Sequence, residues 1–86
     1  MGPKSEAWLH AAGINDLMQL KQIGAIAAYY RLTYLNNVPE NLNLLYALEG
    51  AISDRSWQYV AKHDKTRLLM ELEGYKQLQQ QFNTNQ

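Results

Sequence analysis

The sequence contains no cysteine, so it can supply neither a disulfide framework nor a thiolate metal site. It also lacks any stretch approaching the ~20 consecutive apolar residues that a membrane-spanning helix needs. The N-terminus has no apolar core of the kind found in secretory signals, and Glu6 stands where N-myristoylation requires Ser or Thr. Together these absences predict a cytoplasmic protein.

A surplus of positive charge is also missing. Eight Lys and Arg residues balance eight Asp and Glu residues, which gives a formal net charge of zero. Proteins that bind nucleic acid mainly through phosphates carry a visible excess of cations, because each neutralised phosphate releases counterions and adds affinity. Any nucleic-acid contact of this chain would therefore be local and weak, or strengthened by another subunit.

Motifs for catalysis or metal binding are absent as well. The only two histidines, His10 and His63, fall in separate predicted helices without companion ligands. There is no paired-carboxylate signature, nucleophile elbow or GxxxxGK phosphate loop. The sequence thus predicts no enzymatic activity, no metal and no cofactor. Glu49, which is embedded among apolar residues, is expected to cap a helix or pair internally.

The sequence does contain a globular share of hydrophobic residues, 47% of 86 residues, which fits one domain. Glycine, proline and capping residues divide it into helical segments, and the predicted fold class is all-α, a compact bundle of about five helices. Residues 1–78 would form the domain and residues 79–86 a flexible polar tail. The longer helices are expected at about 3–12, 25–35, 40–52 and 64–80, with shorter ones near 17–20 and 57–60.

Two glycines stand directly before predicted helices. Gly2 precedes Lys4 and Ser5, and Gly24 precedes the helix that begins at Ala25. Glycine allows a tight turn and exposes the first N–H groups of a helix, which can bind a phosphate oxygen as in helix–hairpin–helix modules. Gly2, Lys4, Ser5 and Gly24 are therefore candidate DNA or phosphate contacts, although both glycines are explained more simply as turns.

The predicted helix at 25–35 is apolar on nearly all sides. A helix of this kind is either central in the core or partly covered by a partner. Tyr29, Tyr30, Arg31 and Tyr34 are the candidate protein interface, which includes an interface between two copies in a homodimer. Packing in the core or against a protein is the simpler explanation for these aromatic residues than base stacking.

A specific nonapeptide, Asn-Leu-Leu-Tyr-Ala-Leu-Glu-Gly-Ala, occupies residues 43–51. Together with Gly2–Ser5, Ala12–Ile14 and Ile23–Ala25, it resembles the C-terminal domain of the TfoX/Sxy family of bacterial competence regulators. The resemblance covers the chain up to about Leu72. Its signature residues, which are expected to lie mostly in the core, are Asn43, Leu44, Leu45, Tyr46, Ala47, Leu48, Glu49, Gly50 and Trp57.

The resemblance implies a regulatory role. Family proteins promote transcription of competence genes and DNA uptake together with the cyclic-AMP receptor protein, and full-length members carry another domain ahead of this one. The resemblance therefore implies a non-enzymatic interaction domain whose partners are the cyclic-AMP receptor protein and RNA polymerase. Two alternatives from the residues stay open: a weak, sequence-independent DNA-binding module at Gly2–Ser5, and a dimerisation domain that uses the tyrosine-rich helix.

Overall fold

A computed structural model describes residues 3–84 of the chain and the side chains of residues 4–81. Within this part the chain forms six α-helices and one π-helix and contains no strand, so the all-α prediction is confirmed. The elements are α1 (Pro3–Ala11), α2 (Leu17–Ile23), α3 (Ala25–Tyr30), η1 (Arg31–Leu35), α4 (Leu42–Ser53), α5 (Trp57–His63) and α6 (Lys65–Thr84).

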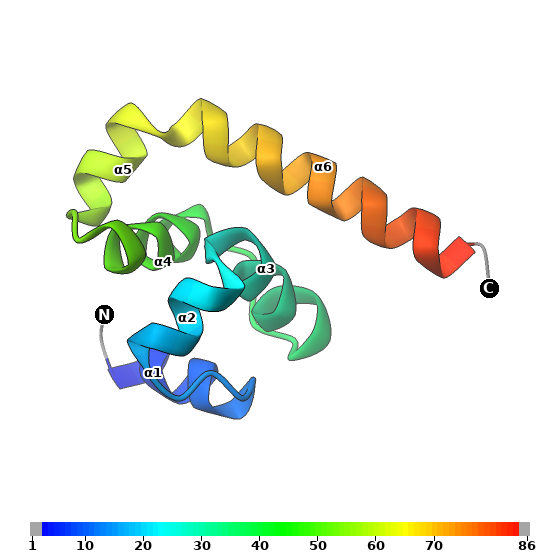
Figure 1. The fold of residues 1–86 in the computed structure, drawn as a ribbon, viewed down its shortest axis with the longest axis horizontal. Coiled ribbons are helices and arrows are strands. Elements are labelled where there is room, and N and C mark those ends of the chain that lie inside the picture. Colours follow the sequence, from blue (N-terminus) through cyan, green and yellow to red (C-terminus); the bar gives the residue numbers. More distant parts are fainter. Residues whose placement is uncertain (1–2, 85–86) are drawn as a thin grey trace.

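α3 and α4 lie in the middle of the molecule, and the long helix α6 runs along one side while α1 lies on the other (Figure 1). α3 packs against α4 and α6, and α5 packs closely against α4. The described helices, taken one by one, all fall short of the length or the hydropathy that crossing a bilayer requires.

Helix ends follow the local turn chemistry of the sequence. α1 ends in a Schellman motif: Gly13 adopts a left-handed φ of +84°, and the Ile14 N–H donates to the Leu9 carbonyl over 2.8 Å. Ile14 and Leu9 are both buried, which supplies the apolar contact that accompanies this motif. Asp16 then caps α2 by accepting a 2.8 Å hydrogen bond from the Gln19 N–H. α1 and α2 are thus fixed relative to each other by only a few loop residues.

Two predicted segments differ from the structure. The helix expected at 25–35 changes from α to π geometry at Arg31, where the Thr33 hydroxyl donates to the Tyr29 carbonyl over 2.9 Å. Such hydrogen bonding from Thr to the preceding turn is known to distort helices. The last helix continues to Thr84, so residues 79–84, expected in a flexible tail, are helical. Glutamine is a good helix former, and neither proline nor glycine follows Gly74 to end the helix.

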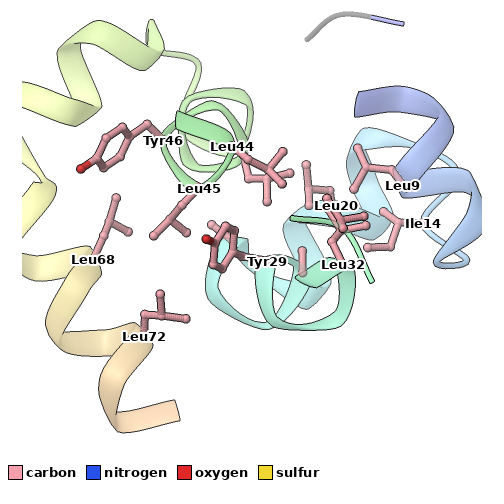
Figure 2. Close-up of a cluster of buried hydrophobic side chains, with 14 of the residues drawn as sticks. Leu9, Ile14, Leu20, Tyr29, Leu32, Leu44, Leu45, Tyr46, Leu68 and Leu72 are labelled. Atoms are coloured by element: carbon pink, nitrogen blue, oxygen red, sulfur yellow. The ribbon is translucent and has the colours of Figure 1, made fainter. Parts of the chain in front are cut away.

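The core is one continuous cluster of leucine and tyrosine side chains (Figure 2). Tyr29 and Leu32 from the α3–η1 segment belong to this cluster with Leu45 and Leu48 of α4, and these four side chains are almost fully buried. α6 lies on one side of the cluster with Leu68 and Leu72, and α1, the following loop and α2 extend it on the other with Leu9, Ile14 and Leu20. Val60 of α5 also belongs to the cluster.

Candidate interaction surface

The start of α1 holds two of the predicted phosphate contacts. Lys4 and Ser5 lie in its first turn, and Gly2 lies outside the described residues. The Lys4 ammonium sits 5.2 Å from the centre of the Trp8 ring, and among the described residues it forms no ion pair. Ser5, Trp8 and Trp57 all line a hollow of about 290 Å³. An exposed cation therefore stands beside a hollow with two indole rings.

Gly24 is the single residue between α2 and α3. Its φ of +89° and ψ of 156° belong to a region that only glycine adopts readily. Its N–H already donates to the Leu20 carbonyl over 2.8 Å, so this group is not free to bind a phosphate. The observed geometry favours the interpretation of Gly24 as a turn residue.

Tyr29 is not part of a surface. It is only 1% exposed, and its hydroxyl accepts a 3.0 Å hydrogen bond from the Asn41 N–H. Burial raises the pKa of Tyr29 above its ordinary value, because the charged phenolate would lose its hydration. The prediction that Tyr29 belongs to a protein interface is wrong, since this side of α3 faces the core.

The remaining tyrosines of this segment are partly covered by α6. The Tyr30 ring centre lies 4.7 Å from that of Tyr34 and 5.2 Å from that of Tyr75. The Tyr34 hydroxyl donates to Glu40 over 2.7 Å, and Lys76 pairs with the same carboxylate at 3.2 Å. The hydrogen bond from Tyr34, followed by the interaction with Lys76, lowers the pKa of Glu40. An internal partner thus occupies much of the surface predicted for another protein.

Arg31, the fourth residue of the predicted interface, is half-buried. Its guanidinium donates to the Ala12 carbonyl over 3.4 Å and so connects η1 to the end of α1. This contact is between two parts of the same chain. Of the four predicted interface residues, only Tyr34 is substantially exposed, at 44%.

The nonapeptide lies in α4. Four of its side chains, Leu44, Leu45, Tyr46 and Leu48, are buried as expected. Asn43 lies on the surface beside Asn41, whose side chain caps the helix. Trp57, which was expected among the mostly buried signature residues, is 44% exposed at the start of α5. It therefore contributes to the surface, where it lines the hollow beside Trp8.

A groove of about 350 Å³ lies between α1 and α2. Its floor is apolar, formed by the buried side chains of Leu9, Ile14 and Leu20. Leu17 lies at the groove and is 48% exposed, and the neighbouring Met18 is 70% exposed. Adjacent exposed apolar side chains above an apolar floor are unusual on a surface that contacts only water.

The polar residues of the groove are Glu6, His10, Asn15 and Asp16, of which two are acidic. Glu6 and Asp16 both line it, together with His10, and neither Lys nor Arg does. Glu6 forms no ion pair within the described part of the chain, and Asp16 is the cap of α2. This groove was not predicted from the sequence. The signal was the pair Leu17-Met18 near Leu20, since two adjacent residues of a helix point in different directions and cannot both face the core with Leu20.

Between residues 3 and 84 there is no group of three side chains that could hold a metal ion. His10 lies at the groove just described, and the ring centre of His63 lies 4.3 Å from that of Tyr59 on the surface of α5. The two histidines are thus on different parts of the molecule.

The family model of the TfoX C-terminal domain matches residues 1–72. The chain belongs to the TfoX C-terminal domain family. Comparisons with curated proteins and with solved structures found no match. The matched segment ends at Leu72, the last buried residue of the core in the described part of the chain, and leaves out residues 73–84 of α6.

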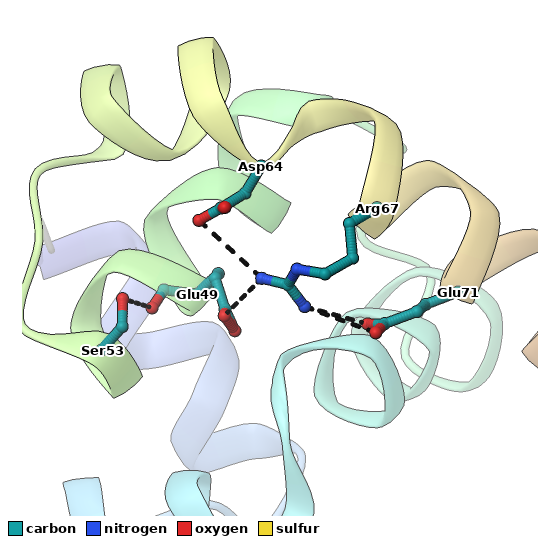
Figure 3. Close-up of polar contacts among 5 residues, drawn as sticks. All are labelled: Glu49, Ser53, Asp64, Arg67 and Glu71. Carbon is teal, nitrogen blue, oxygen red and sulfur yellow. Dashed lines mark hydrogen bonds and ion pairs between the residues drawn. The ribbon is translucent and has the colours of Figure 1, made fainter.

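In this TfoX C-terminal domain, Glu49 connects α4 to α6 (Figure 3). Its carboxylate lies 3.4 Å from the Arg67 guanidinium, which is also 3.3 Å from Glu71 and 3.8 Å from Asp64. Burial alone would lower the pKa of Arg67, but the hydrogen bond with Glu49 and the charge of Glu71 raise it overall. The prediction that Glu49 pairs internally is confirmed.

The position after Glu49 has no room for a side chain, which explains why it is occupied by Gly50. A Cβ atom at this position would lie 2.5 Å from the Arg55 carbonyl oxygen, because the chain turns back over the end of α4. The turn is held by Asp54 in the left-handed region and by the Arg55 N–H, which donates to the Gly50 carbonyl over 2.8 Å. The Glu-Gly pair of the nonapeptide thus serves the packing of α4 against α5 and α6.

Proposed function

We propose that this chain is a non-enzymatic regulatory domain that acts by protein–protein contact in the transcription of competence genes and DNA uptake, in the cytoplasm. The observation that carries the proposal is membership of the TfoX C-terminal domain family over residues 1–72. The proposed partners are the cyclic-AMP receptor protein and RNA polymerase, as the resemblance to TfoX/Sxy regulators implies.

The distribution of charge supports a protein partner over nucleic acid. The net charge is zero, and two of the cations, Arg67 and Lys76, are paired with carboxylates of the same chain. The chain has no net excess of cations, so its affinity for nucleic acid gains little from counterion release. Exposed apolar side chains such as Leu17 and Met18 offer area that a protein partner could bury.

A pull-down tests this proposal directly. The tagged chain is incubated with purified cyclic-AMP receptor protein, with and without cyclic AMP, and separately with RNA polymerase, each after nuclease treatment. We expect retention of at least one partner that withstands the nuclease, above the level of the tag alone. A full-length family member serves as positive control. If it retains a partner and this chain retains none, the proposed function is wrong for this domain.

Weak DNA binding at the start of α1 is a second candidate, favoured by Lys4 beside the hollow that Trp8 and Trp57 border. Binding of this kind should fall steeply with salt. Lys4→Glu should abolish it, whereas Lys21→Glu, the same charge change on the exposed end of α2, should have little effect. Equal effects of the two variants in fluorescence anisotropy with labelled DNA would argue against a site at Lys4.

Dimerisation through the tyrosine-rich helix has less support than either candidate. Tyr29 is buried, and Tyr30 packs against Tyr75 of α6 in the same chain. Of the three tyrosines in the α3–η1 segment, only Tyr34 is substantially exposed to a partner copy. Light scattering of the wild type measures the oligomeric state that this alternative requires.

A further inference from the structure

We propose that the groove between α1 and α2 is the docking surface for an amphipathic helix of a protein partner, which inserts an apolar side chain between Glu6 and Asp16 and flanks it with Lys or Arg. The inference rests on the proposed function as a protein-interaction domain, and it adds the surface and the chemistry of the partner. The groove combines an apolar floor, two acidic residues at its rim and exposed apolar side chains beside it.

The floor fits an apolar anchor. Leu9, Ile14 and Leu20 are between 2% and 6% exposed, and these apolar side chains line the bottom of the groove. A volume of about 350 Å³ lies at the lower end of the range for ligand sites, which suits an inserted side chain better than a large cofactor. Helix-in-groove recognition uses such anchors at helical spacing.

The rim selects for positive charge. Glu6 and Asp16 come from opposite walls, α1 and the start of α2, and Glu6 has no cation paired with it in the described structure. Phosphate groups would be repelled here, which argues against nucleic acid as the occupant. A Lys or Arg beside the anchor would instead gain charge complementarity, which fixes orientation and speeds association.

Leu17 supplies the exposed edge of the contact. It is the first residue of α2 and is 48% exposed, so a helix lying in the groove would cover it. Met18 follows it at 70% exposure, and methionine adapts to partners of different shape. The groove and these two side chains together make an apolar strip bordered by acids.

The test uses a defined probe, a capped peptide of leucine and lysine arranged as an amphipathic helix. A matched peptide carries glutamate in place of lysine. In NMR titrations of the isotope-labelled chain, we expect the lysine peptide to shift amide signals of the groove, and the glutamate peptide to bind far more weakly. Signals that shift elsewhere, or equal binding of both peptides, would overturn the inference.

Variants of single residues locate the contact. Leu17→Asp should weaken binding of the lysine peptide by about tenfold or more, whereas Leu78→Asp, a change at a similarly exposed leucine of α6, should leave it unchanged. Aspartate is favourable in the first turn of a helix, so Leu17→Asp should fold, and circular dichroism checks this. Glu6→Lys, at an exposed position, should weaken the lysine peptide and strengthen the glutamate peptide.

The same variants separate this inference from the proposed function. If the wild type retains a transcription partner and Leu17→Asp retains it equally well, the groove is wrong while the function stands. If the peptide binds in the groove but neither transcription protein is retained, the groove stands and the assigned partners are wrong. If Leu17→Asp instead converts a dimer to a monomer in light scattering, the occupant is a second copy and the inference of a foreign helix fails.

Discussion

Substitution of Gly50 by alanine should destabilise the domain even though Gly50 lies in a helix, where alanine is normally favoured. The new Cβ atom would meet the Arg55 carbonyl oxygen at 2.5 Å and backbone atoms of Ser56 and Trp57 at 3.5 Å. Backbone cannot rotate away as a side chain can, so the turn between α4 and α5 must move. Overpacking of this kind costs about 1–3 kcal/mol.

Two further effects set the net magnitude. Alanine gains about 1 kcal/mol over glycine in a helix interior. Movement of the turn would also weaken the 2.8 Å hydrogen bond from the Arg55 N–H to the Gly50 carbonyl, and such bonds contribute about 0.5–1.5 kcal/mol each. We therefore expect Gly50→Ala to lower the free energy of unfolding by about 1–2 kcal/mol.

Gly74 provides a matched control in the same chain. It lies inside α6, is exposed, and would place a Cβ atom with no other atom within 4 Å. Gly74→Ala should therefore keep only the gain in helix propensity and raise the free energy of unfolding by about 0.5–1 kcal/mol. The two variants make the same chemical change, so the difference between them reports the contact with Arg55.

Urea unfolding followed by circular dichroism measures both free energies, and thermal unfolding gives an independent reading. For a domain of this size, 1 kcal/mol shifts Tm by roughly 4–8 °C. Trp57 lies directly after the strained turn, so its fluorescence should change in Gly50→Ala and not in Gly74→Ala. If Gly50→Ala proves as stable as Gly74→Ala, the turn moves at no cost and the steric reasoning is refuted.

Three other variants test separate features of the fold. Gly24→Ala should lower stability by about 1–3 kcal/mol in urea unfolding, because the φ of +89° strains any residue with a Cβ although no neighbour would be touched. Burial raises the pKa of Tyr29, so above about pH 10 the folded state binds more protons than the unfolded state. The contribution of Tyr29 to the free energy of unfolding is therefore fully present below about pH 10 and should be lost as the pH rises toward the folded pKa. Tyr29→Phe should remove this loss of stability at alkaline pH, measured by thermal melting at several pH values. At neutral pH the variant should be less stable by about 1 kcal/mol, because the hydrogen bond from the Asn41 N–H is gone. If the alkaline loss persists in the variant, it comes from another group. Arg67→Met should leave Glu49 without its partner and lower the free energy of unfolding by about 1 kcal/mol at low salt. The effect should be smaller at high salt, because Arg67 is half-exposed and salt screens its charge. An effect that does not depend on salt would mean that Arg67 acts by packing and not by charge.

Much of the fold could be predicted because its helix boundaries depend on local chemistry. Gly13 ends α1, Asp16 caps α2, and Pro39 lies in the turn before α4, so residue types that commonly end or cap helices stand at these boundaries. Where polar and apolar residues alternate at helical spacing, the buried side was also predictable, as with Leu68 and Leu72 of α6. These features need no knowledge of distant contacts.

The orientation of α3 could not be predicted for the opposite reason. Its residues are apolar on nearly all sides, so the sequence contains no polar face to show which side meets water. The sequence predicts Tyr29 as an interface residue together with Tyr30 and Tyr34, but Tyr29 is buried, as are Ala25 and Ala28 of the same helix. The side of α3 that is buried is set by its packing against α4 and α6, and these contacts join residues far apart in the sequence.

The groove between α1 and α2 escaped prediction because it belongs to no single helix. Leu9 comes from α1, Ile14 from the loop and Leu20 from α2, and each alone is an ordinary core residue. Only the Schellman turn at Gly13 brings the acidic side chains of Glu6 and Asp16 to the same groove. A surface of this kind requires the tertiary structure.

Most residues of the nonapeptide are not free to contact a partner. Leu45 and Leu48 fill the core, Glu49 pairs with Arg67, and Gly50 makes room for the Arg55 carbonyl. Each of these roles is completed within the chain, so the nonapeptide accounts for the fold and leaves partner recognition to side chains that are still exposed. A substitution in the nonapeptide should therefore reduce binding only as far as it reduces stability, whereas Leu17→Asp should reduce binding while the fold persists. Comparison of unfolding and pull-down data for Gly50→Ala and Leu17→Asp distinguishes the two, and a Gly50→Ala domain that is fully folded but cannot bind would contradict this division.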